Sequence, residues 1–328
     1  MSKIGILGAG GWGIAFGMMC LKNGHSVSVW TPFENERDTI LKDREHRALL
    51  KNIKIPEAID VTCELEDVTD SDIIVIAVPS GAVSETAARI KGLVSDNSVV
   101  ICLSKGLDGK RMMLMSDLIK EHLPEVKLCI VSGPSHAEEV ARDLLTAVVA
   151  ASEDISVAEY VQRELSCETF RIYTSDDVVG VELAGALKNV MALAAGILDG
   201  IGYEDNTKAA LMTRGMYEIS RLGVAMGGKA STYLGLAGFG DLIVTCTSMH
   251  SRNRRAGILI GKGISAEETL KQIGMTVEGY TTTKAAYTFA NAKNIEMPIV
   301  SEIYKVLYEG KNVPEAIHDL MSRPMKAE

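Results

Sequence analysis

The most constraining feature of the sequence is a run of glycines close to the start of the chain. Lys3 to Leu7 (KIGIL) is predicted as a buried strand, and the sequence GAGGWG follows it directly at residues 8–13. Trp12 to Asn23 is predicted as a helix and Ser26 to Trp30 as a second strand. A strand, a glycine turn, a helix and a second strand in this order are typical of a dinucleotide-binding unit.

Each glycine of this turn has a separate role in such a unit. Gly8 permits the tight reversal, Gly10 lets backbone N–H groups approach a pyrophosphate, and Gly13 lets the helix pack closely against the strand. The helix that follows directs its positive end toward the phosphates. Gly11 and Trp12 fit a cofactor site too, although Trp12 fits a packing role equally. A purely structural glycine turn is the alternative that the sequence leaves open.

Residues 26 to 175 contain short apolar runs separated by polar stretches that favour helices. The runs lack the alternation of a half-exposed strand, so we expect them to be buried on both faces of a sheet. Alternating strands and helices predict a doubly wound sheet with right-handed crossovers. The predicted strands are Ile73 to Val78, Ser98 to Leu103, Lys127 to Val131 and Ala147 to Ala151, and the predicted covering helices are Val83 to Lys91 and Met112 to Glu121.

The carboxyl ends of these strands are where a ligand of such a sheet binds. The second strand ends in Trp30-Thr31-Pro32-Phe33, with the first acid at Glu34 and the first arginine at Arg37. An acid at this end would hydrogen-bond the ribose of NAD, whereas an arginine would favour the 2′-phosphate of NADP. The choice between NADH and NADPH therefore stays open.

After Phe170 to Tyr173 the pattern becomes helical. Ser175 to Asp177 places carboxylates in the first turn of a long helix, and Ser265 to Glu268 has the form of a capping box. We expect a dinucleotide-binding domain, residues 1–174, and an all-helical domain, residues 175–328, that pack closely and share a cleft. The predicted helices are Val178 to Leu198, Asn206 to Met226, Arg254 to Gly261, Ala266 to Gln272, Val277 to Lys293, Val300 to Tyr308 and Pro314 to Met321.

The composition excludes several classes of protein. Hydrophobic residues make up 47% and charged residues 23% of the 328, the balance of a soluble globular chain long enough for about two domains. The net charge of −9 would repel a polyanion, so we expect no nucleic-acid partner. No uninterrupted apolar run reaches the roughly 18 residues of a membrane span.

The six cysteines indicate a reducing compartment. They are scattered, with no CxxC pair and no histidine cluster at ligand spacing. This pattern favours free, mostly buried thiols in the cytoplasm and argues against disulfides and against a metal site. The cysteines are Cys20, Cys63, Cys102, Cys129, Cys167 and Cys246.

Lys188 is the best candidate for a proton donor. Reducing a ketone with a nicotinamide needs a proton donor for the forming alkoxide. The neighbours one turn away are small or apolar, so partial desolvation is expected to lower the pKa of Lys188 towards neutrality. These neighbours are Ala184, Gly185, Met191 and Ala192. A lysine that extends to the surface is the alternative. Lys105, at a strand end, is a second candidate, for which an ordinary exposed lysine is the alternative.

A further informative stretch runs from Leu234 to Arg255. Glycines around Phe239 predict a tight turn that contains Asp241. Ser251 to Asn253 offers a hydroxyl, a guanidinium and an amide in succession, the donors that bind a phosphate, and a helix start adds its own N–H groups. Solvated arginines at a helix N-terminus are the alternative.

Together these motifs resemble the signature blocks of the bacterial soluble NAD(P)-dependent glycerol-3-phosphate dehydrogenases. The blocks occur in order along almost the whole chain: Gly133 to Val140 (GPSHAEEV), Gly180 to Val190 (GVELAGALKNV), Gly235 to Asp241 (GLAGFGD), Ser251 to Asn253, and Val277 to Gly279. The resemblance implies a helical domain like that of 6-phosphogluconate dehydrogenase. It also implies reversible reduction of dihydroxyacetone phosphate to sn-glycerol 3-phosphate, a precursor of phospholipids, and we expect a cytoplasmic homodimer.

The resemblance also implies roles for single residues. Lys188 becomes the proton donor and acceptor, with Lys105 and Asp241 as further catalytic residues. The implied substrate contacts are Lys105, Gly133, Ser135, Lys188, Asp241, Ser251, Arg252 and Asn253. The implied contacts of NADPH or NADH are Gly8, Gly10, Gly11, Trp12, Gly13, Lys105, Ala137, Arg252, Thr276 and Glu278. Three positions depart from the family pattern: Gly11, where Ser or Thr is frequent; Thr31, where relatives often have a basic residue; and His136, where Phe is frequent.

Two other functions remain open. A dehydrogenase of the same architecture that acts on a 3-hydroxy acid would need a carboxylate pocket in place of a phosphate pocket. A non-catalytic sensor of dinucleotide redox state would need only the glycine turn. The sensor hypothesis leaves Lys188 and Ser251 to Asn253 without a role.

Overall fold

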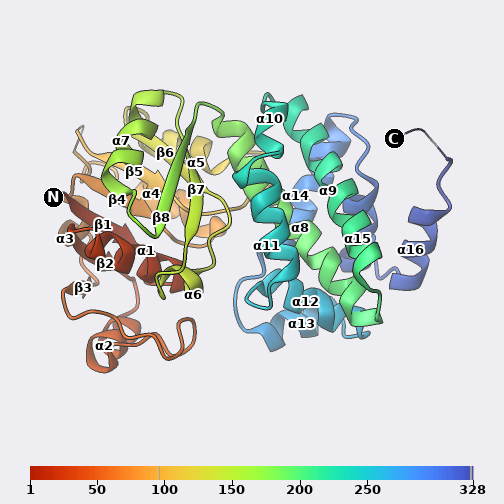
Figure 1. The fold of residues 1–328 in the computed structure, drawn as a ribbon, viewed down its shortest axis with the longest axis horizontal. Helices are drawn as coiled ribbons and strands as arrows, with labels where there is room; N and C mark the ends of the chain where they lie inside the picture. Colours follow the sequence, from red (N-terminus) through yellow and green to blue (C-terminus); the bar gives the residue numbers. More distant parts are fainter. Residues whose placement is uncertain (96, 326, 328) are drawn as a thin grey trace. The chain divides into compact units, whose positions relative to one another are not determined.

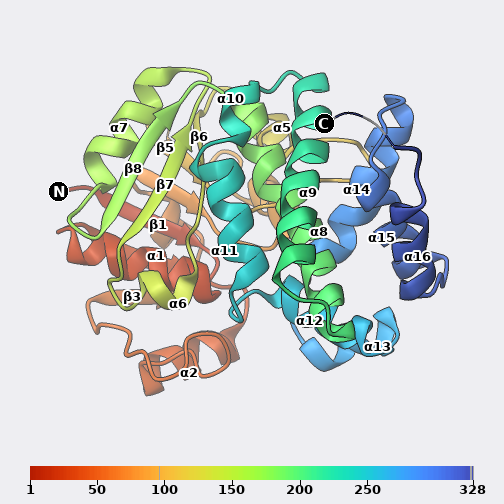
Figure 2. The same ribbon diagram turned by 45° about the vertical axis from the view of Figure 1, so that its right-hand side comes forward.

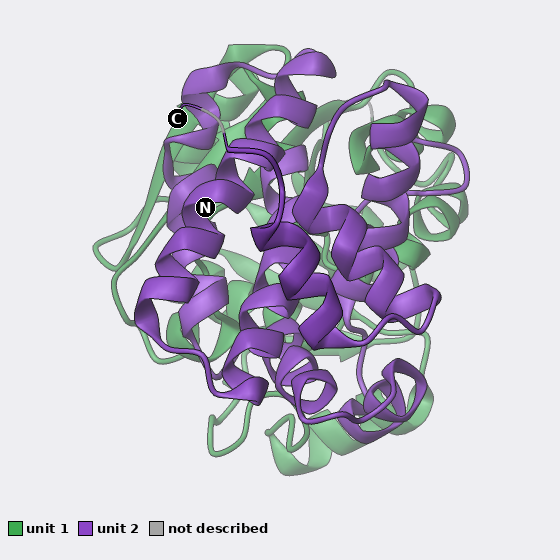
Figure 3. Ribbon diagram, turned by 90° about the vertical axis from the view of Figure 1, so that its right-hand side faces the viewer, with its two compact units in different colours: residues 1–105, 114–182 green, residues 106–113, 183–328 purple. Residues whose placement is uncertain are grey.

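The computed structural model describes residues 1–95, 97–325 and 327. The chain forms two compact units, residues 1–105 with 114–182 and residues 106–113 with 183–328 (Figure 3). It passes from the first unit to the second after Lys105, returns at Leu114, and passes again inside a helix, between Glu182 and Leu183. The domain boundary after Thr174 stays a prediction.

The first unit is built on an eight-stranded sheet (Figure 1). Its strand order is β3-β2-β1-β4-β5-β6-β7-β8, which confirms the doubly wound arrangement. All neighbours pair in parallel except β6 and β7, so the sheet is mixed. The strands are β1 (Lys3–Leu7), β2 (Ser26–Trp30), β3 (Ile59–Thr62), β4 (Ile73–Ile76), β5 (Val99–Cys102), β6 (Lys127–Ser132), β7 (Thr146–Ala151) and β8 (Phe170–Ser175).

The antiparallel pair has a local cause. A parallel return needs a crossover of a dozen or more residues, usually through a full helix. The connection after β6 contains only the single turn of α6 (Ala137–Val140), so β7 runs back beside β6.

Helices cover both faces of this sheet (Figure 2). Alternate side chains of a strand point to opposite faces, and Ile4 and Ile6 pack in one core with residues of α1 and α7. On the other face of β1, a Cβ on Gly5 would lie 1.8 Å from the carbonyl oxygen of Val68, so α3 packs directly on the strand. The remaining helices of the unit are α1 (Gly11–Lys22), α2 (Glu34–Asp43), α3 (Glu66–Thr69), a 3₁₀ turn (Ser80–Ala82), α4 (Val83–Arg89), α5 (Met115–His122) and α7 (Ile155–Leu165).

Sequence analysis does not predict β3, α2 or α7. Strand β3 has only four residues, and α2 buries only Ile40, so neither gives a clear period. Helix α7 carries the signals of a helix, because Asp154 caps it and an apolar stripe runs along it. The helix predicted from Met112 begins at Met115, since Met112 has a φ of 55°, outside the helical region.

The second unit is helical, and α8 (Val178–Ile201) enters it as the core helix. Its side chains are buried without interruption from Leu183 to Leu198. The helix is long and apolar enough to cross a membrane, but 89% of its most apolar window is buried inside the protein. It begins at Val178, so the acids predicted for its first turn precede it, and Asp177 accepts a hydrogen bond from the N–H of Gly180 at 2.9 Å.

The other helices surround α8. Helix α12 packs backbone to backbone against it, because a Cβ on Gly257 would lie 2.1 Å from the carbonyl oxygen of Leu193. Every helix predicted for this part of the chain has a counterpart, whereas α10 and α11 are not predicted. The helices are α9 (Asp205–Ala225), α10 (Ala230–Tyr233), a π-helical turn (Leu236–Gly240), α11 (Asp241–Thr247), α12 (Arg252–Gly261), α13 (Ala266–Ile273), α14 (Glu278–Ala292), α15 (Pro298–Tyr308) and α16 (Val313–Met321).

Candidate active site

The glycine turn between β1 and α1 has the geometry that its sequence predicts. Gly8 has a φ of 123° and donates its N–H to the carbonyl of Trp30 at 2.9 Å. A Cβ on Gly8 would lie 2.8 Å from the carbonyl oxygen of Ala77, and one on Gly13 would lie 2.0 Å from that of Gly8. Both positions therefore require glycine for the turn and for the close packing of α1.

Gly10 is different, because a Cβ there would meet no protein atom within 4 Å. Packing within the protein does not require glycine at this position. Gly10 is the N-cap of α1, where backbone N–H groups and the helix dipole favour an anion. The turn also follows β1 where the strand order reverses between β2 and β4, the position at which this fold binds dinucleotides. These residues therefore fit a pyrophosphate.

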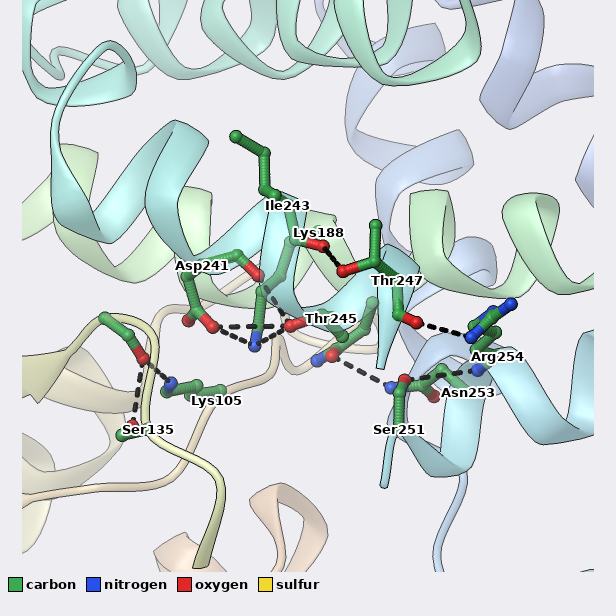
Figure 4. A network of polar contacts seen from close by, with 12 residues as sticks. Lys105, Ser135, Lys188, Asp241, Ile243, Thr245, Thr247, Ser251, Asn253 and Arg254 are labelled. Atoms are coloured by element: carbon green, nitrogen blue, oxygen red, sulfur yellow. Dashed lines mark hydrogen bonds and ion pairs between the residues drawn. The ribbon is translucent and has the colours of Figure 1, made fainter. Parts of the chain in front are cut away.

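Lys105, Gly133 and Ser135 lie together at the ends of β5 and β6 (Figure 4). The carbonyl oxygen of Gly133 accepts hydrogen bonds from the ammonium of Lys105 and from the hydroxyl of Ser135, each at 2.9 Å.

Trp12 packs edge-on against Phe16 with 5.8 Å between ring centroids, which supports its packing role. Ala137 is the first residue of α6.

Lys188 lies on α8 and is only 6% exposed, so the alternative of a surface lysine is wrong. Its ammonium donates to Oδ1 of Asp241 at 2.5 Å and to Oγ1 of Thr245 at 2.7 Å (Figure 4). Burial disfavours the ammonium form, whereas a carboxylate at this distance favours it. The expectation from the sequence takes account of burial but not of the carboxylate of Asp241.

Asp241 is the first residue of α11 and is 1% exposed. The prediction that it lies within a tight turn is therefore wrong: a π-helical turn, Leu236–Gly240, leads into the helix that Asp241 begins. The Thr245 hydroxyl, one turn later, donates to the backbone carbonyl of Asp241 at 2.6 Å. Because its hydrogen is used in this way, the Thr245 oxygen is oriented to accept from Lys188.

Asn253, on α12, belongs to a second buried network, with Asn189 on α8 and Gly279 on α14. Its Nδ2 donates to Oδ1 of Asn189 at 2.9 Å, and its Oδ1 accepts from the N–H of Gly279 at 2.8 Å. These bonds join α8, α12 and α14 at Asn189, the residue that follows Lys188 in the sequence. The bonds also fix the orientation of both side-chain amides.

Ser251, Arg252 and Arg254, which flank Asn253, make different contacts. Ser251 is the N-cap of α12 and accepts from the N–H of Arg254 at 3.2 Å. Arg254 bonds to Asp199 at 2.7 Å and to the carbonyl of Thr247 at 2.5 Å, so it is engaged in holding helices together. Arg252 is exposed and begins α12.

The predicted site residues are divided between the units. The first unit contains the glycine turn, Lys105, Gly133, Ser135 and Ala137, and the second contains Lys188, Asp241, Ser251 to Asn253, Thr276 and Glu278. Thr276 is exposed before α14, and Glu278 is its first residue.

The sequence analysis does not predict Thr245 or Asn189 as site residues. Thr245 lies one helical turn after Asp241, and Asn189 directly follows Lys188. These two spacings are the only sign in the sequence that Thr245 and Asn189 lie close to the predicted site residues.

The cysteines take no part in either network. Burial raises the pKa of Cys102, Cys129 and Cys246 to about 12, which leaves them as unreactive thiols. Across residues 1–95, 97–325 and 327, no three side chains of His, Cys, Asp or Glu are grouped to hold a metal ion.

Two family models match the chain. Residues 3–158 match the model described as NAD-dependent glycerol-3-phosphate dehydrogenase N-terminus, and residues 177–318 match the one described as the C-terminus of the same enzyme. Together they cover both units.

Curated relatives and solved structures agree with these matches. The chain is 52% identical over 327 residues to a glycerol-3-phosphate dehydrogenase [NAD(P)+] of a Thermoanaerobacter species, covering 99% of this chain and 98% of the relative. It is 47% identical over 331 residues to the enzyme of the same name from Fusobacterium nucleatum, covering 100% and 99%. The crystal structure of glycerol-3-phosphate dehydrogenase from Coxiella burnetii is 36% identical and has a TM-score of 0.93, covering 98% of this chain and 99% of that one. This protein belongs to the NAD-dependent glycerol-3-phosphate dehydrogenase family.

Proposed function

We propose that the protein interconverts dihydroxyacetone phosphate and sn-glycerol 3-phosphate by hydride transfer with NADH or NADPH. The observation that carries this proposal is the buried contact of Lys188 with Asp241 and Thr245. A buried lysine with two oriented oxygen partners is arranged for proton transfer. The names of the relatives support the same reaction.

The glycine turn and the N-terminus of α1 hold the pyrophosphate of the cofactor, as the open position at Gly10 supports. Gly11, Trp12, Lys105, Ala137, Arg252, Thr276 and Glu278 are its further proposed contacts. When bound, the nicotinamide supplies the hydride that reaches C2 of the ketone.

Lys188 supplies the proton. As C2 accepts the hydride, its ketone oxygen becomes an alkoxide, and the proton moves from the Lys188 ammonium to that oxygen. Asp241 stabilises the charged ammonium before this transfer, and Thr245 fixes its direction. In the oxidation direction the neutral amine of Lys188 accepts the hydroxyl proton instead.

The phosphate of the substrate binds at the start of α12. Arg252 is the first residue of α12, where backbone N–H groups and the helix N-terminus favour a dianion. Asn253, whose amide also bonds to Asn189 and Gly279, is a further proposed contact of the substrate. Ser251 caps the same turn. Lys105, Gly133 and Ser135 are the proposed substrate contacts of the first unit. Fixing the phosphate fixes the position of C2, which is the main use of binding energy in such a reaction.

The cellular role follows from the product. Glycerol 3-phosphate is the backbone of phospholipids, so we propose that the enzyme supplies this precursor in the cytoplasm.

We also propose a homodimer. Leu234 is 74% exposed and Ile243 is 48% exposed in the second unit, and exposed apolar side chains of this kind support a contact between copies.

An assay at 340 nm tests the activity. Dihydroxyacetone phosphate is supplied with NADH and with NADPH in separate reactions, and oxidation of 3-hydroxybutyrate with each oxidised cofactor serves as the comparison. The proposal expects turnover with the phosphorylated ketone and none with the hydroxy acid. Binding of the cofactor without turnover of either substrate would favour the redox sensor instead.

A further inference from the structure

The carboxyl end of β2 holds a carboxylate that the order of residues in the sequence does not place there. Thr31, the residue directly after β2, is uncharged, and Glu36 follows five residues later in the first turn of α2. In the structure the hydroxyl of Thr31 donates to Oε2 of Glu36 at 2.5 Å. The carboxylate of Glu36 is therefore held back at the end of the strand.

This end of β2 lies beside the glycine turn. Strand β2 pairs in parallel with β1 (Figure 1), and Gly8 donates its N–H to the carbonyl of Trp30, the residue before Thr31. The N–H of Thr31 donates to the carbonyl of Thr62 at 3.0 Å, which continues the pairing of β2 with β3. Through Thr31, Glu36 is thus tied to the sheet next to the turn that is proposed to hold the pyrophosphate.

His46 holds Glu36 from a second side. Its Nε2 lies 3.3 Å from Oε1 of Glu36. The backbone carbonyl of His46 accepts from the N–H groups of Leu49 at 3.1 Å and Leu50 at 2.8 Å. A Cβ on Gly11 would lie 3.2 Å from Cβ of Leu49, so this turn packs against the first residue of α1. Both donors to Glu36 therefore come from segments that adjoin the glycine turn.

The carboxylate of Glu36 is charged and has room for a ligand. The hydrogen bonds from His46 and Thr31 lower the pKa of Glu36, so the group is ionised at neutral pH. Each of its oxygens accepts one of these bonds, whereas a carboxylate has about four acceptor positions. The side chain is 30% exposed. Hydroxyl groups of a ligand can therefore donate to the same carboxylate.

The neighbouring arginines are paired with other acids. Nη2 of Arg37 lies 2.8 Å from Oδ1 of Asp38, and Nη2 of Arg47 lies 3.1 Å from Oδ2 of Asp43. An arginine near this strand end would favour the 2′-phosphate of NADP, whereas an acid would hydrogen-bond the ribose of NAD. Glu36 is the charged group that Thr31 ties to the strand end.

We propose that Glu36 selects NADH over NADPH and that Thr31 positions it for this role. The carboxylate accepts hydrogen bonds from the hydroxyl groups of the adenosine ribose of NADH. The 2′-phosphate of NADPH would bring further negative charge beside Glu36, and like charges held together in a binding site reduce affinity. This inference rests on the proposed function, because it requires the cofactor to lie at the glycine turn.

Fluorescence titration of the full-length protein with NADH and with NADPH tests the selection. The Kd for NADH is expected to be at least about tenfold lower. ADP-ribose should displace NADH more readily than 2′-phospho-ADP-ribose by a similar factor, because the discrimination lies at the ribose and not at the nicotinamide. Equal dissociation constants for NADH and NADPH would overturn the inference. Tighter binding of NADPH would overturn it in favour of an arginine contact such as Arg37.

These titrations need no turnover, so the inference and the proposed reaction can fail separately. Preference for NADH without reduction of dihydroxyacetone phosphate would contradict the reaction and support the selection by Glu36. Reduction of dihydroxyacetone phosphate with equal dissociation constants for the two cofactors would contradict the selection alone.

Two matched variants assign the preference to one carboxylate. Glu36→Gln removes the charge and keeps an oxygen that can accept from Thr31, so the ratio of the NADPH and NADH dissociation constants should fall to about one. Glu34→Gln removes an exposed charge from the same helical turn and should leave the ratio unchanged. An equal change in both variants would reveal a general effect of charge and contradict the role of Glu36.

The positioning role of Thr31 is tested by its hydroxyl. Thr31→Val keeps the shape of the side chain but removes the donor to Glu36, so the preference for NADH should weaken severalfold. Thr31→Ser keeps a hydroxyl and should retain the preference. Circular dichroism establishes that both variants are folded. A folded Thr31→Val with the ratio of the unaltered protein would contradict the positioning role.

Discussion

The ammonium nitrogen of Lys188 lies 2.5 Å from Oδ1 of Asp241, and both side chains are almost fully buried. The two residues are far apart in the sequence and reach each other from α8 and α11. A buried ion pair contributes little net stability, because desolvation opposes the attraction. The retention of such a pair, on the residues proposed to carry out the reaction, is therefore better explained by chemistry than by stability.

Replacing Thr245 by Val tests the orientation of Lys188. The substitution keeps the shape of the side chain but removes the oxygen that accepts from the ammonium at 2.7 Å. We expect kcat to fall about 10- to 100-fold, the cost of misplacing a proton donor. Thr247→Val is the matched control on the same helix, because the Thr247 hydroxyl donates to the carbonyl of Ile243 at 2.8 Å just as the Thr245 hydroxyl donates to that of Asp241. An equal loss in both variants would contradict the role of Thr245.

Removing Arg252 tests the phosphate site. Arg252→Ala should raise the KM for dihydroxyacetone phosphate about 10- to 100-fold, since a charge-assisted hydrogen bond to an anion is lost, and should change kcat much less. Lys262→Ala, an exposed cation at the other end of α12, is the control. Steady-state assays over a range of substrate concentration separate the two parameters. An unchanged KM in Arg252→Ala would move the phosphate elsewhere.

Two glycines of the same turn should respond differently to alanine. Gly13→Ala places a Cβ 2.0 Å from the carbonyl of Gly8 and should destabilise the protein. Gly10→Ala meets no protein atom and should leave Tm nearly unchanged while weakening cofactor binding at least tenfold. Thermal unfolding and fluorescence titration with NADH measure the two effects. Tight cofactor binding by Gly10→Ala would argue that the pyrophosphate lies away from this turn.

Glu182 should make the first unit less stable as the pH rises. Its carboxylate accepts from the N–H of Ser116 at 2.9 Å and bonds to the Ser116 hydroxyl, and burial raises its pKa to about 7. The folded protein therefore holds a proton on Glu182 that the unfolded chain releases near pH 4.5. Through this group the free energy of unfolding falls by about 3 kcal/mol between pH 4.5 and pH 7 and levels off above pH 7.

The variant Glu182→Gln isolates that contribution. Glutamine keeps both partners at Ser116 but carries no charge, so urea unfolding should show a flatter pH dependence than in the unaltered protein. Glu125→Gln changes an exposed carboxyl group and should keep the original slope. Parallel curves for Glu182→Gln and the unaltered protein would show that another group titrates.

The parts of the fold that could be predicted are those with a strong period or a fixed backbone requirement. Strand β1, the turn at Gly8 and Gly13, and the core helix α8 follow from buried runs and from glycines that only one geometry explains. Helix α2 could not be predicted in this way, because its single buried residue, Ile40, gives no periodic signal. The reversal of β7 depends on the segment after β6 forming only the single turn of α6, which a strand pattern does not reveal.

The site shows the same limit. Lys188 could be singled out because its helix neighbours are apolar, but its partners come from elements far along the chain. The glycines before Asp241 predict a tight turn, whereas a π-helical turn leads to Asp241 at the start of α11. The sequence does not distinguish Arg254 from Arg252, whereas in the structure Arg254 contacts Asp199 and the carbonyl of Thr247. Tertiary contacts of this kind have no local signature.

The role of Lys188 is tested most directly by the single-turnover rate of hydride transfer in Lys188→Ala, followed at 340 nm with saturating NADH and dihydroxyacetone phosphate. Circular dichroism and NADH titration establish that the variant is folded and binds cofactor as before. Loss of the proton donor should slow the transfer about 100- to 10,000-fold, and Lys188→Arg should not restore it, because arginine keeps the charge but does not release a proton at neutral pH. A rate within tenfold of the unaltered enzyme would contradict the assignment of Lys188 as the proton donor.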